Sequence, residues 1–204
     1  MESTFPNPLS KLVVDEEIKL KGKYKDLLRH LQATGDLGAG FSHVLSFYKN
    51  RPDYNIDFVR DCLEELEHSK RFIHRQNSFL VELNIWYGHI SPKSQEESVK
   101  LALESWNSLN LPISIIEKAT PLILALKHDS PQKDESAYAC DIDLVRFGKS
   151  PEHFIMPKGF NVTYANLFRY LLDREHIYQT EYFRGRCENN ARINLENLLN
   201  RLAS

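Results

Sequence analysis

The segment TEYFRGRCENNARINLENLLNRL, from Thr180 to Leu202, decides the fold class of this 204-residue chain. Its apolar side chains recur every three or four residues, which places them on one face of an α-helix. They are Phe183, Cys187, Ala191, Leu195, Leu198 and Leu202. Thr180 stands directly before this pattern and is a favourable N-cap. The segment therefore predicts a long amphipathic helix with its apolar face on a core.

The same helical period recurs along most of the chain, and no sustained strand alternation occurs. Helices are predicted over residues 15–33, 41–48, 79–87, 94–109, 112–127, 138–147, 161–172 and 180–202, and from residue 55 onward. The pattern thus predicts an all-α bundle of about eight to ten helices. We expect a single globular unit, in which residues 1–40 form a helical extension packed on a helical domain of residues 41–204.

Three local signals refine this prediction. Ser94 and Glu97 match a capping box, in which a serine hydroxyl and a glutamate three residues later satisfy free backbone donors. Pro121 stands inside the helix predicted over 112–127 and should kink it or cost it a hydrogen bond. The polar stretch 129–136 is typical of a loop.

Composition excludes several classes of protein. Hydrophobic residues make up 42% and charged residues 26%, as in ordinary globular chains. The net charge is −2, so the basic excess of a phosphate-gripping nucleic-acid binder is absent and we expect no nucleic-acid partner. The absence of a signal-peptide pattern and of a 20-residue apolar run predicts no membrane partner. Three cysteines predict a reduced, cytoplasmic protein, with a nuclear location left open.

The strong catalytic and metal-binding motifs are missing. The eight histidines form no HExxH, and no CxxC, GxSxG, Walker A or GxGxxG pattern occurs. Asp141 and Asp143 stand near the start of a predicted helix, where they either favour the helix dipole or serve as ligands of a hard metal. The basic side chains of the last helix are interpreted as a solvated face rather than an anion site. They are Arg184, Arg186, Arg192 and Arg201.

Seven short motifs follow one another from about residue 40 to the C-terminus. They are RPDYNIDFV (51–59), WYGH (86–89), SQEESVKLA (94–102), LILALKH (122–128), DIDLVRFG (141–148), DREHIYQT (173–180) and ARINL (191–195). In their order and spacing the chain resembles the predicted metal-dependent phosphohydrolases of the HD superfamily, in its small bacterial and fungal branch. The resemblance implies the HD fold, a compact helical bundle.

The resemblance also implies a metal site whose ligands this chain has mostly lost. In that family a histidine of the first motif, the His-Asp pair of the second and a later aspartate hold a divalent metal that activates water. Here Tyr54 and Phe58 stand at histidine positions of the first motif, and Gly88 and His89 replace the His-Asp pair. Tyrosine and phenylalanine do not replace imidazole as ordinary ligands of such a metal, and glycine has no ligand atom.

The residues that remain leave a reduced ligand set. By their motifs, Asp143 matches the later aspartate, with Asp141 as the alternative, and His128 matches a later histidine of the family. His89, His128 and Asp143 are therefore the metal-ligand candidates. No residue is assigned a catalytic role. The former site is expected to be lined by Tyr54, Phe58, Trp86, Tyr87, Gly88 and His89.

Three functions follow as hypotheses. The favoured one is a non-catalytic HD-fold protein, a pseudoenzyme without cofactor that acts as a scaffold or interaction module for a protein partner. The alternative is a divergent phosphohydrolase that uses Mn or Fe on a nucleotide or another phosphate ester. The third is a ligand-sensing pocket with an aromatic wall, against which stands the simpler interpretation that these side chains fill the old site.

The oligomeric state is not predicted. The charged run over residues 15–25 is interpreted as a solvated helix face. Together with the basic last helix, it is the first place to examine for partner binding.

Overall fold

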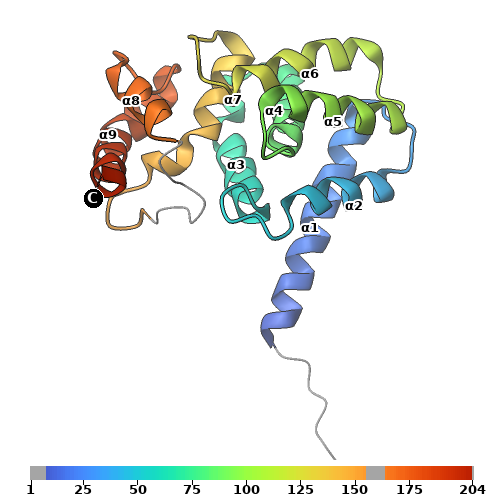
Figure 1. The fold of residues 1–204 in the computed structure, drawn as a ribbon. Coiled ribbons are helices and arrows are strands. Elements are labelled where there is room, and N and C mark those ends of the chain that lie inside the picture. Colours follow the sequence, from blue (N-terminus) through green and yellow to red (C-terminus); the bar gives the residue numbers. More distant parts are fainter. Residues whose placement is uncertain (1–7, 155–163, 204) are drawn as a thin grey trace, which may run out of the picture.

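The computed structural model describes residues 8–154 and 164–203. Within these residues the protein contains helices and no strand (Figure 1). The α-helices are α1 (Pro8–His30), α2 (Leu37–Tyr48), α3 (Ile56–Ser69), α4 (Arg75–Tyr87), α5 (Gln95–Ser108), α6 (Ile113–Ala125), α7 (Asp134–Asp143), α8 (Ala165–Asp173) and α9 (Glu181–Ala203). Two short 3-10 helices, η1 (Lys70–Phe72) and η2 (Val145–Gly148), join them. The predicted all-α bundle of eight to ten helices is confirmed.

Several helix ends differ from the prediction. The first helix, predicted over 15–33, begins at Pro8 and ends at His30. The second begins at Leu37 rather than 41, because the Asp36 carboxylate accepts hydrogen bonds from the backbone N–H groups of Gly38 and Ala39 at 2.8 and 3.0 Å. These caps satisfy donors that the apolar periodicity does not reveal.

Two further helices begin earlier or later than expected. The stretch 129–136 was predicted to be a loop, but α7 begins at Asp134. Asp134 and Glu135 lie in its first turn, where negative charge is favourable. The helix predicted over 161–172 corresponds to α8, which begins at Ala165, and residues 161–163 lie outside the described part of the chain.

Helix α4 forms the centre of the bundle. It packs against α1, α3, α5, α6 and α7, and every residue from Leu80 to Tyr87 is buried. A helix that is buried on all sides needs no polar face, which explains its weak amphipathic pattern. The dense apolar run at 79–87, predicted to be a buried helix, therefore marks the core.

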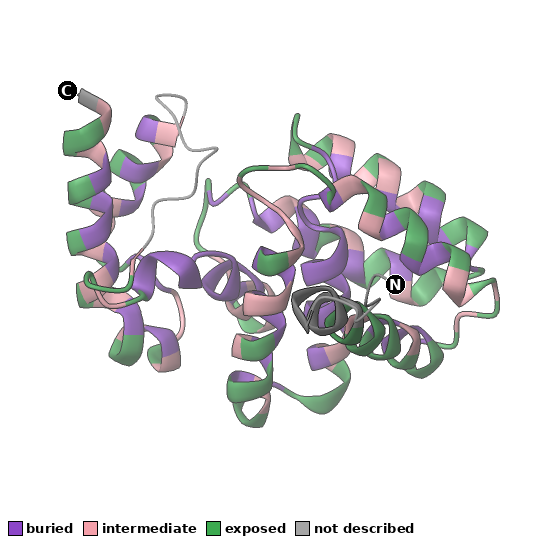
Figure 2. Ribbon diagram, turned by 90° about the horizontal axis from the view of Figure 1, so that it is seen from below, coloured by how far each residue is buried: buried purple, intermediate pink, exposed green. Residues whose placement is uncertain are grey.

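The two ends of the chain attach to this core differently. The C-terminal half of α1 packs on the core through the buried side chains of Tyr24, Leu27 and Leu28. Its N-terminal half projects from the body (Figure 1). At the other end, α8 and α9 pack against each other, and α9 also packs on η2. All four residues of η2 are buried, as Figure 2 shows for this segment.

Helix α6 continues through Pro121, which was expected to kink the helix or to cost it a hydrogen bond. Pro121 lies within Ile113–Ala125 and is exposed. It has no N–H to donate to the carbonyl four residues earlier, so the helix forgoes one backbone hydrogen bond there. No helix in the described ranges combines the length and the apolar run that crossing a membrane would require.

Candidate functional site

Three helices end at one buried point, and each delivers one of the candidate ligands. His89 follows the end of α4 by two residues, His128 follows the end of α6, and Asp143 is the last residue of α7. Helices α4, α6 and α7 pack on one another. The fold therefore brings together three residues that lie apart in the sequence.

The three side chains form a closed hydrogen-bonded cluster. The Asp143 carboxylate accepts one bond from His89 Nε2 at 2.6 Å and one from His128 Nε2 at 2.8 Å. All three residues are buried. Each imidazole uses a different carboxylate oxygen, so both oxygens of Asp143 are occupied by neighbours within the protein.

The ionisation of Asp143 fixes where the imidazole protons lie. Burial alone would raise the Asp143 pKa, but the charge and hydrogen bonds of His89 and His128 outweigh it and hold that pKa below its usual value. A carboxylate only accepts hydrogen bonds, so both Nε2 atoms must carry protons. The second ring nitrogen of His89 lies 3.5 Å from Gln95 Nε2, and His128 Nδ1 has no hydrogen-bond partner among the described residues.

His128 reaches this cluster through a left-handed backbone conformation. Its φ angle is 57°, in a region that L-residues occupy at a cost. The backbone N–H of His128 donates to the Ala125 carbonyl at 3.0 Å and closes the last turn of α6. The chain reverses sharply after α6, and this turn directs the His128 imidazole toward Asp143. The strained backbone of His128 therefore allows its hydrogen bond with Asp143.

Aromatic rings cover His89. The Tyr54 ring stacks on the His89 ring, with centroids 3.8 Å apart and planes 14° apart. Phe58 packs edge-on against both rings, at 5.0 Å from Tyr54 and 5.7 Å from His89. The Arg146 guanidinium lies 3.9 Å from the Phe58 ring centroid and 4.8 Å from that of Tyr54. These contacts fill the space beside the imidazole.

A layer of polar side chains covers His89 and Tyr54 on the solvent side; its members are Arg51, Asp53, Arg146 and Tyr164. Arg51 donates to the His89 carbonyl and pairs with Asp53 at 3.6 Å. The Tyr164 hydroxyl donates to the Asp53 carboxylate at 3.1 Å, and Arg146 donates to the Asp53 carbonyl at 3.3 Å. Burial raises the Asp53 pKa, but the Tyr54 N–H, Arg51 and Tyr164 more than offset it and leave this pKa below its usual value.

Little free volume remains. The cavity beside His89 and Asp143 measures about 10 Å³, about the minimum that one water molecule requires. A Cβ atom added at Gly88 would lie 2.5 Å from Leu126 Cδ1 and 2.8 Å from the Asn84 carbonyl oxygen. The position that the resemblance gives to a metal-binding side chain is therefore closed by packing.

Comparison of the chain with protein-family models, curated proteins and solved structures found no match. The resemblance to HD-superfamily proteins thus stays a prediction from the motifs.

The remaining residues predicted for the site lie elsewhere. The Trp86 ring packs against Tyr24 and Phe41, and the Tyr87 hydroxyl forms hydrogen bonds with Tyr24 at 2.7 Å and Ser105 at 3.0 Å. Both side chains thus turn toward α1, α2 and α5. Of the aromatic residues predicted to line the former site, Tyr54 and Phe58 contact the His89 ring.

Asp141 has a structural position. Its carboxylate accepts hydrogen bonds from the backbone N–H groups of Gln179 at 2.7 Å and Thr180 at 2.8 Å, directly before α9. Desolvation by burial nevertheless raises its pKa to about 6. Asp141 therefore anchors the start of α9 and does not join Asp143 at the cluster.

The donor atoms do not fit a metal ion as they are arranged. A metal ligand offers the nitrogen lone pair, whereas each Nε2 here directs a proton at Asp143. Across residues 8–154 and 164–203, no three His, Cys, Asp or Glu side chains surround a point where a metal could bind. We therefore derive no chemical step through a metal.

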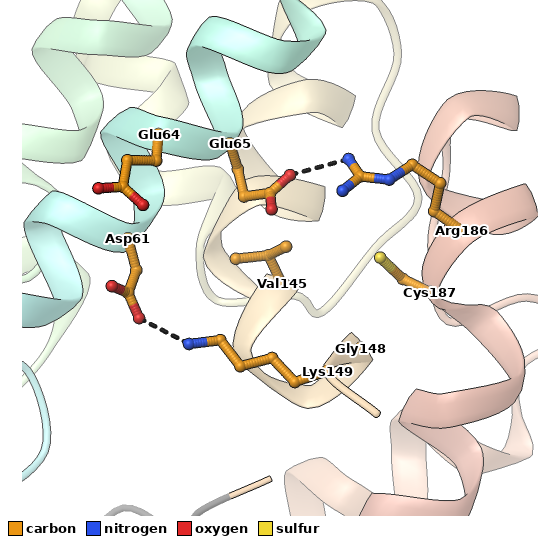
Figure 3. A pocket seen from close by; sticks show the side chains of 8 residues that line it. All are labelled: Asp61, Glu64, Glu65, Val145, Gly148, Lys149, Arg186 and Cys187. Carbon is orange, nitrogen blue, oxygen red and sulfur yellow. Dashed lines mark hydrogen bonds and ion pairs between the residues drawn. The ribbon is translucent and has the colours of Figure 1, made fainter. Parts of the chain in front are cut away.

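A separate pocket of about 250 Å³ lies between α3, η2 and α9 (Figure 3). Two ion pairs bridge its walls, Lys149 to Asp61 at 2.8 Å and Arg186 to Glu65 at 2.9 Å.

The basic side chains of α9 make further contacts: Arg192 pairs with Glu188 and donates to the carbonyls of Leu172, Arg174 and Glu175. Much of the predicted basic face of the last helix thus joins helices together.

The polar layer of the site has no clear signal in the sequence. Arg51, Asp53 and Arg146 lie within the quoted motifs, but no spacing rule links residue 53 to residue 146. Tyr164 carries no motif signal. The only available hint was Arg146 inside the apolar run Leu144–Phe147, because an arginine buried there needs partners.

Proposed function

We propose that this chain is a non-catalytic, HD-like protein that acts as a scaffold or interaction module for a protein partner. The observation that carries the proposal is the closed His89–Asp143–His128 cluster. Residues that would have to face a metal and a water molecule instead bond to one another. Because both carboxylate oxygens of Asp143 are occupied by these imidazoles, the contact supports a structural role.

The surroundings of the cluster support the same conclusion. Small-molecule sites usually have volumes of several hundred Å³, whereas the cavity here measures about 10 Å³. Tyr54, Phe58 and Arg146 occupy the approach to His89. A phosphate ester could reach the cluster only if this layer moved apart, which argues against both the phosphohydrolase and the ligand-sensing hypotheses.

One observation keeps the phosphohydrolase as the second candidate. Two imidazoles lie within hydrogen-bond distance of one buried carboxylate, and this combination of residue types suits Fe(II) or Mn(II) in other proteins. Binding would require both Nε2 protons to leave and the carboxylate to release at least one imidazole. The candidate therefore predicts a metal affinity that rises with pH.

Elemental mass spectrometry separates the two candidates. Protein purified without a His tag or chelator, and then incubated with Mn(II) or Fe(II), should contain far less than one metal per chain. It should also be inert toward a panel of nucleotides and phosphate esters. Near-stoichiometric metal that is lost in His128→Ala, together with turnover that is lost in Asp143→Ala, would establish the enzyme and refute the proposal.

The scaffold role has its own test in the native cell. If the protein works through a partner, Asp143→Asn should restore function to cells that lack the wild-type protein, provided that the variant accumulates to the same level. The Asn side chain keeps the shape of Asp143 while removing its charge. Failure of a normally folded and abundant Asp143→Asn variant would indicate that the cluster itself has a function.

A further inference from the structure

Helix α1 carries a surface that the bundle leaves uncovered. Its N-terminal half projects from the body (Figure 1), and residues Asp15–Lys19 are all exposed. Ile18 has 62% of its surface exposed, so this helix presents a large aliphatic side chain to solvent among its charged residues. This surface does not overlap the His89–Asp143–His128 cluster, so an inference from it does not depend on the proposed function.

The charges on this helix are divided into two blocks. Residues 15–17 read Asp-Glu-Glu, and lysines occupy positions 19, 21, 23 and 25. Two of these groups are used within the chain, because Glu16 pairs with Arg60 and Lys23 pairs with Glu67. Asp15, Glu17, Lys21 and Lys25 form no ion pair within the described part of the chain, although Lys21 and the half-buried Lys25 lie close enough to the Asp36 carboxylate to lower its pKa. The helix is therefore acidic at one end and basic at the other.

The outward face of the helix also contains a gap. Gly22 follows Ile18 by four residues, so the two lie on the same side of the helix. A Cβ atom added at Gly22 would have no neighbour within 4 Å. Tyr24, Leu27 and Leu28 face the core from the opposite side. The bulky Ile18 side chain thus lies one helical turn from Gly22, where another helix could approach the α1 backbone closely.

We propose that this face binds a second copy of the same chain, with the two α1 helices antiparallel. In that orientation Ile18 of each protomer packs over Gly22 of the other. The same twofold arrangement places Asp15 opposite Lys25 of the other copy, so each acidic block meets a basic block. Such an isologous contact is closed and limits assembly to a dimer.

The dimer should be weak and sensitive to salt. A contact between two single helices buries less area than a standard protein interface, and exposed ion pairs are screened as ionic strength rises. Sedimentation equilibrium of the full-length protein from about 1 to about 500 µM covers interfaces of this class. We expect the average mass to rise above the 23.8 kDa monomer with concentration, and to rise less in high salt.

Charge reversal tests the orientation. Asp15→Lys and Lys25→Glu should each raise the dimer dissociation constant at least tenfold, because like charges then face each other. An equimolar mixture of the two variants should form a heterodimer, because one wild-type Asp15–Lys25 ion pair is kept and the other pair is restored with its charges exchanged. Glu175→Lys is the matched control: it changes the charge by the same amount at an exposed position between α8 and α9, and should leave dimerisation unchanged.

The variant Gly22→Gln separates a loss of dimerisation from a loss of folding. The new side chain has open space in the monomer and a better helix propensity than glycine, so the melting temperature should rise. The same side chain should raise the dimer dissociation constant at least tenfold by blocking Ile18 of the second copy. A wild-type protein that stays at the monomer mass throughout would overturn the proposal, as would a dimer that is indifferent to all three α1 variants.

Discussion

At the residue scale, Asp143 joins the segments that follow α4 and α6 through one carboxylate. Its carboxylate accepts hydrogen bonds from two buried imidazoles, and no other described residue satisfies the same protons. Asp143→Ala should lower the free energy of unfolding by about 3–5 kcal/mol, because it leaves buried polar groups without their charged partner. Urea denaturation checks this value. Asp129→Ala, at an exposed carboxylate nearby, should change it by less than about 0.5 kcal/mol.

The sign of the pH dependence at Asp143 follows from its depressed pKa. The stabilisation from this carboxylate is complete above the unfolded-state pKa of 3.8 and is lost as the pH falls below it. The difference in stability between the wild type and Asp143→Ala should therefore shrink in acid. A difference that is constant from pH 6 to pH 3 would contradict the proposed ionisation.

Asp141 should behave in the opposite way. Its folded-state pKa is raised by burial to about 6, above the unfolded value of 3.8. The folded protein therefore binds the proton more tightly, and the stability that depends on Asp141 falls as the pH rises from about 4 to about 6. The loss should be about 3 kcal/mol relative to Asp141→Asn, at 1.36 kcal/mol per pKa unit. Carbon-13 NMR titration of the carboxyl groups measures the pKa directly; an Asp141 midpoint near 4 would refute this prediction.

At the scale of the element, helix ends were harder to predict than helix interiors. The apolar period located the middle of each helix, but side-chain caps set where some of them begin. Ser94 accepts a hydrogen bond from the Glu97 N–H at 3.2 Å, which confirms this half of the predicted capping box. Asp36 caps α2 in a similar way, but it stands five residues before the predicted segment 41–48 begins. A capping residue is a single polar side chain, and the same residue types also occur in ordinary turns, so the sequence does not distinguish the two.

Helix α6 offers a test of an element with a built-in defect. Pro121 is exposed and forgoes one backbone hydrogen bond. Pro121→Ala should restore that bond and raise the free energy of unfolding by about 1–3 kcal/mol. Thermal or urea denaturation gives the value. An equal or lower stability would show that the proline serves the packing of α6 in some other way.

At the scale of the whole molecule, the arrangement around α4 predicts a gradient of local stability. Residues Leu80–Tyr87 of α4 are all buried, whereas the N-terminal half of α1 projects from the body. Hydrogen exchange should therefore be slowest in α4 and should approach the rate of global unfolding there, while Asp15–Lys19 should exchange through local opening. Exchange mass spectrometry resolves these segments. Equal protection in the two helices would contradict the observed arrangement.

What the sequence by itself determined was the helical class and the buried helix at 79–87, because local periodicity and residue type are properties that one chain segment can express alone. The candidate residues of the cluster came from the motif resemblance, which stays a prediction. Only the tertiary structure decided that His89 and His128 share the carboxylate of Asp143, that Asp141 anchors α9, and that Arg146 lies on Phe58. These contacts join segments tens of residues apart, and their geometry depends on how whole helices pack.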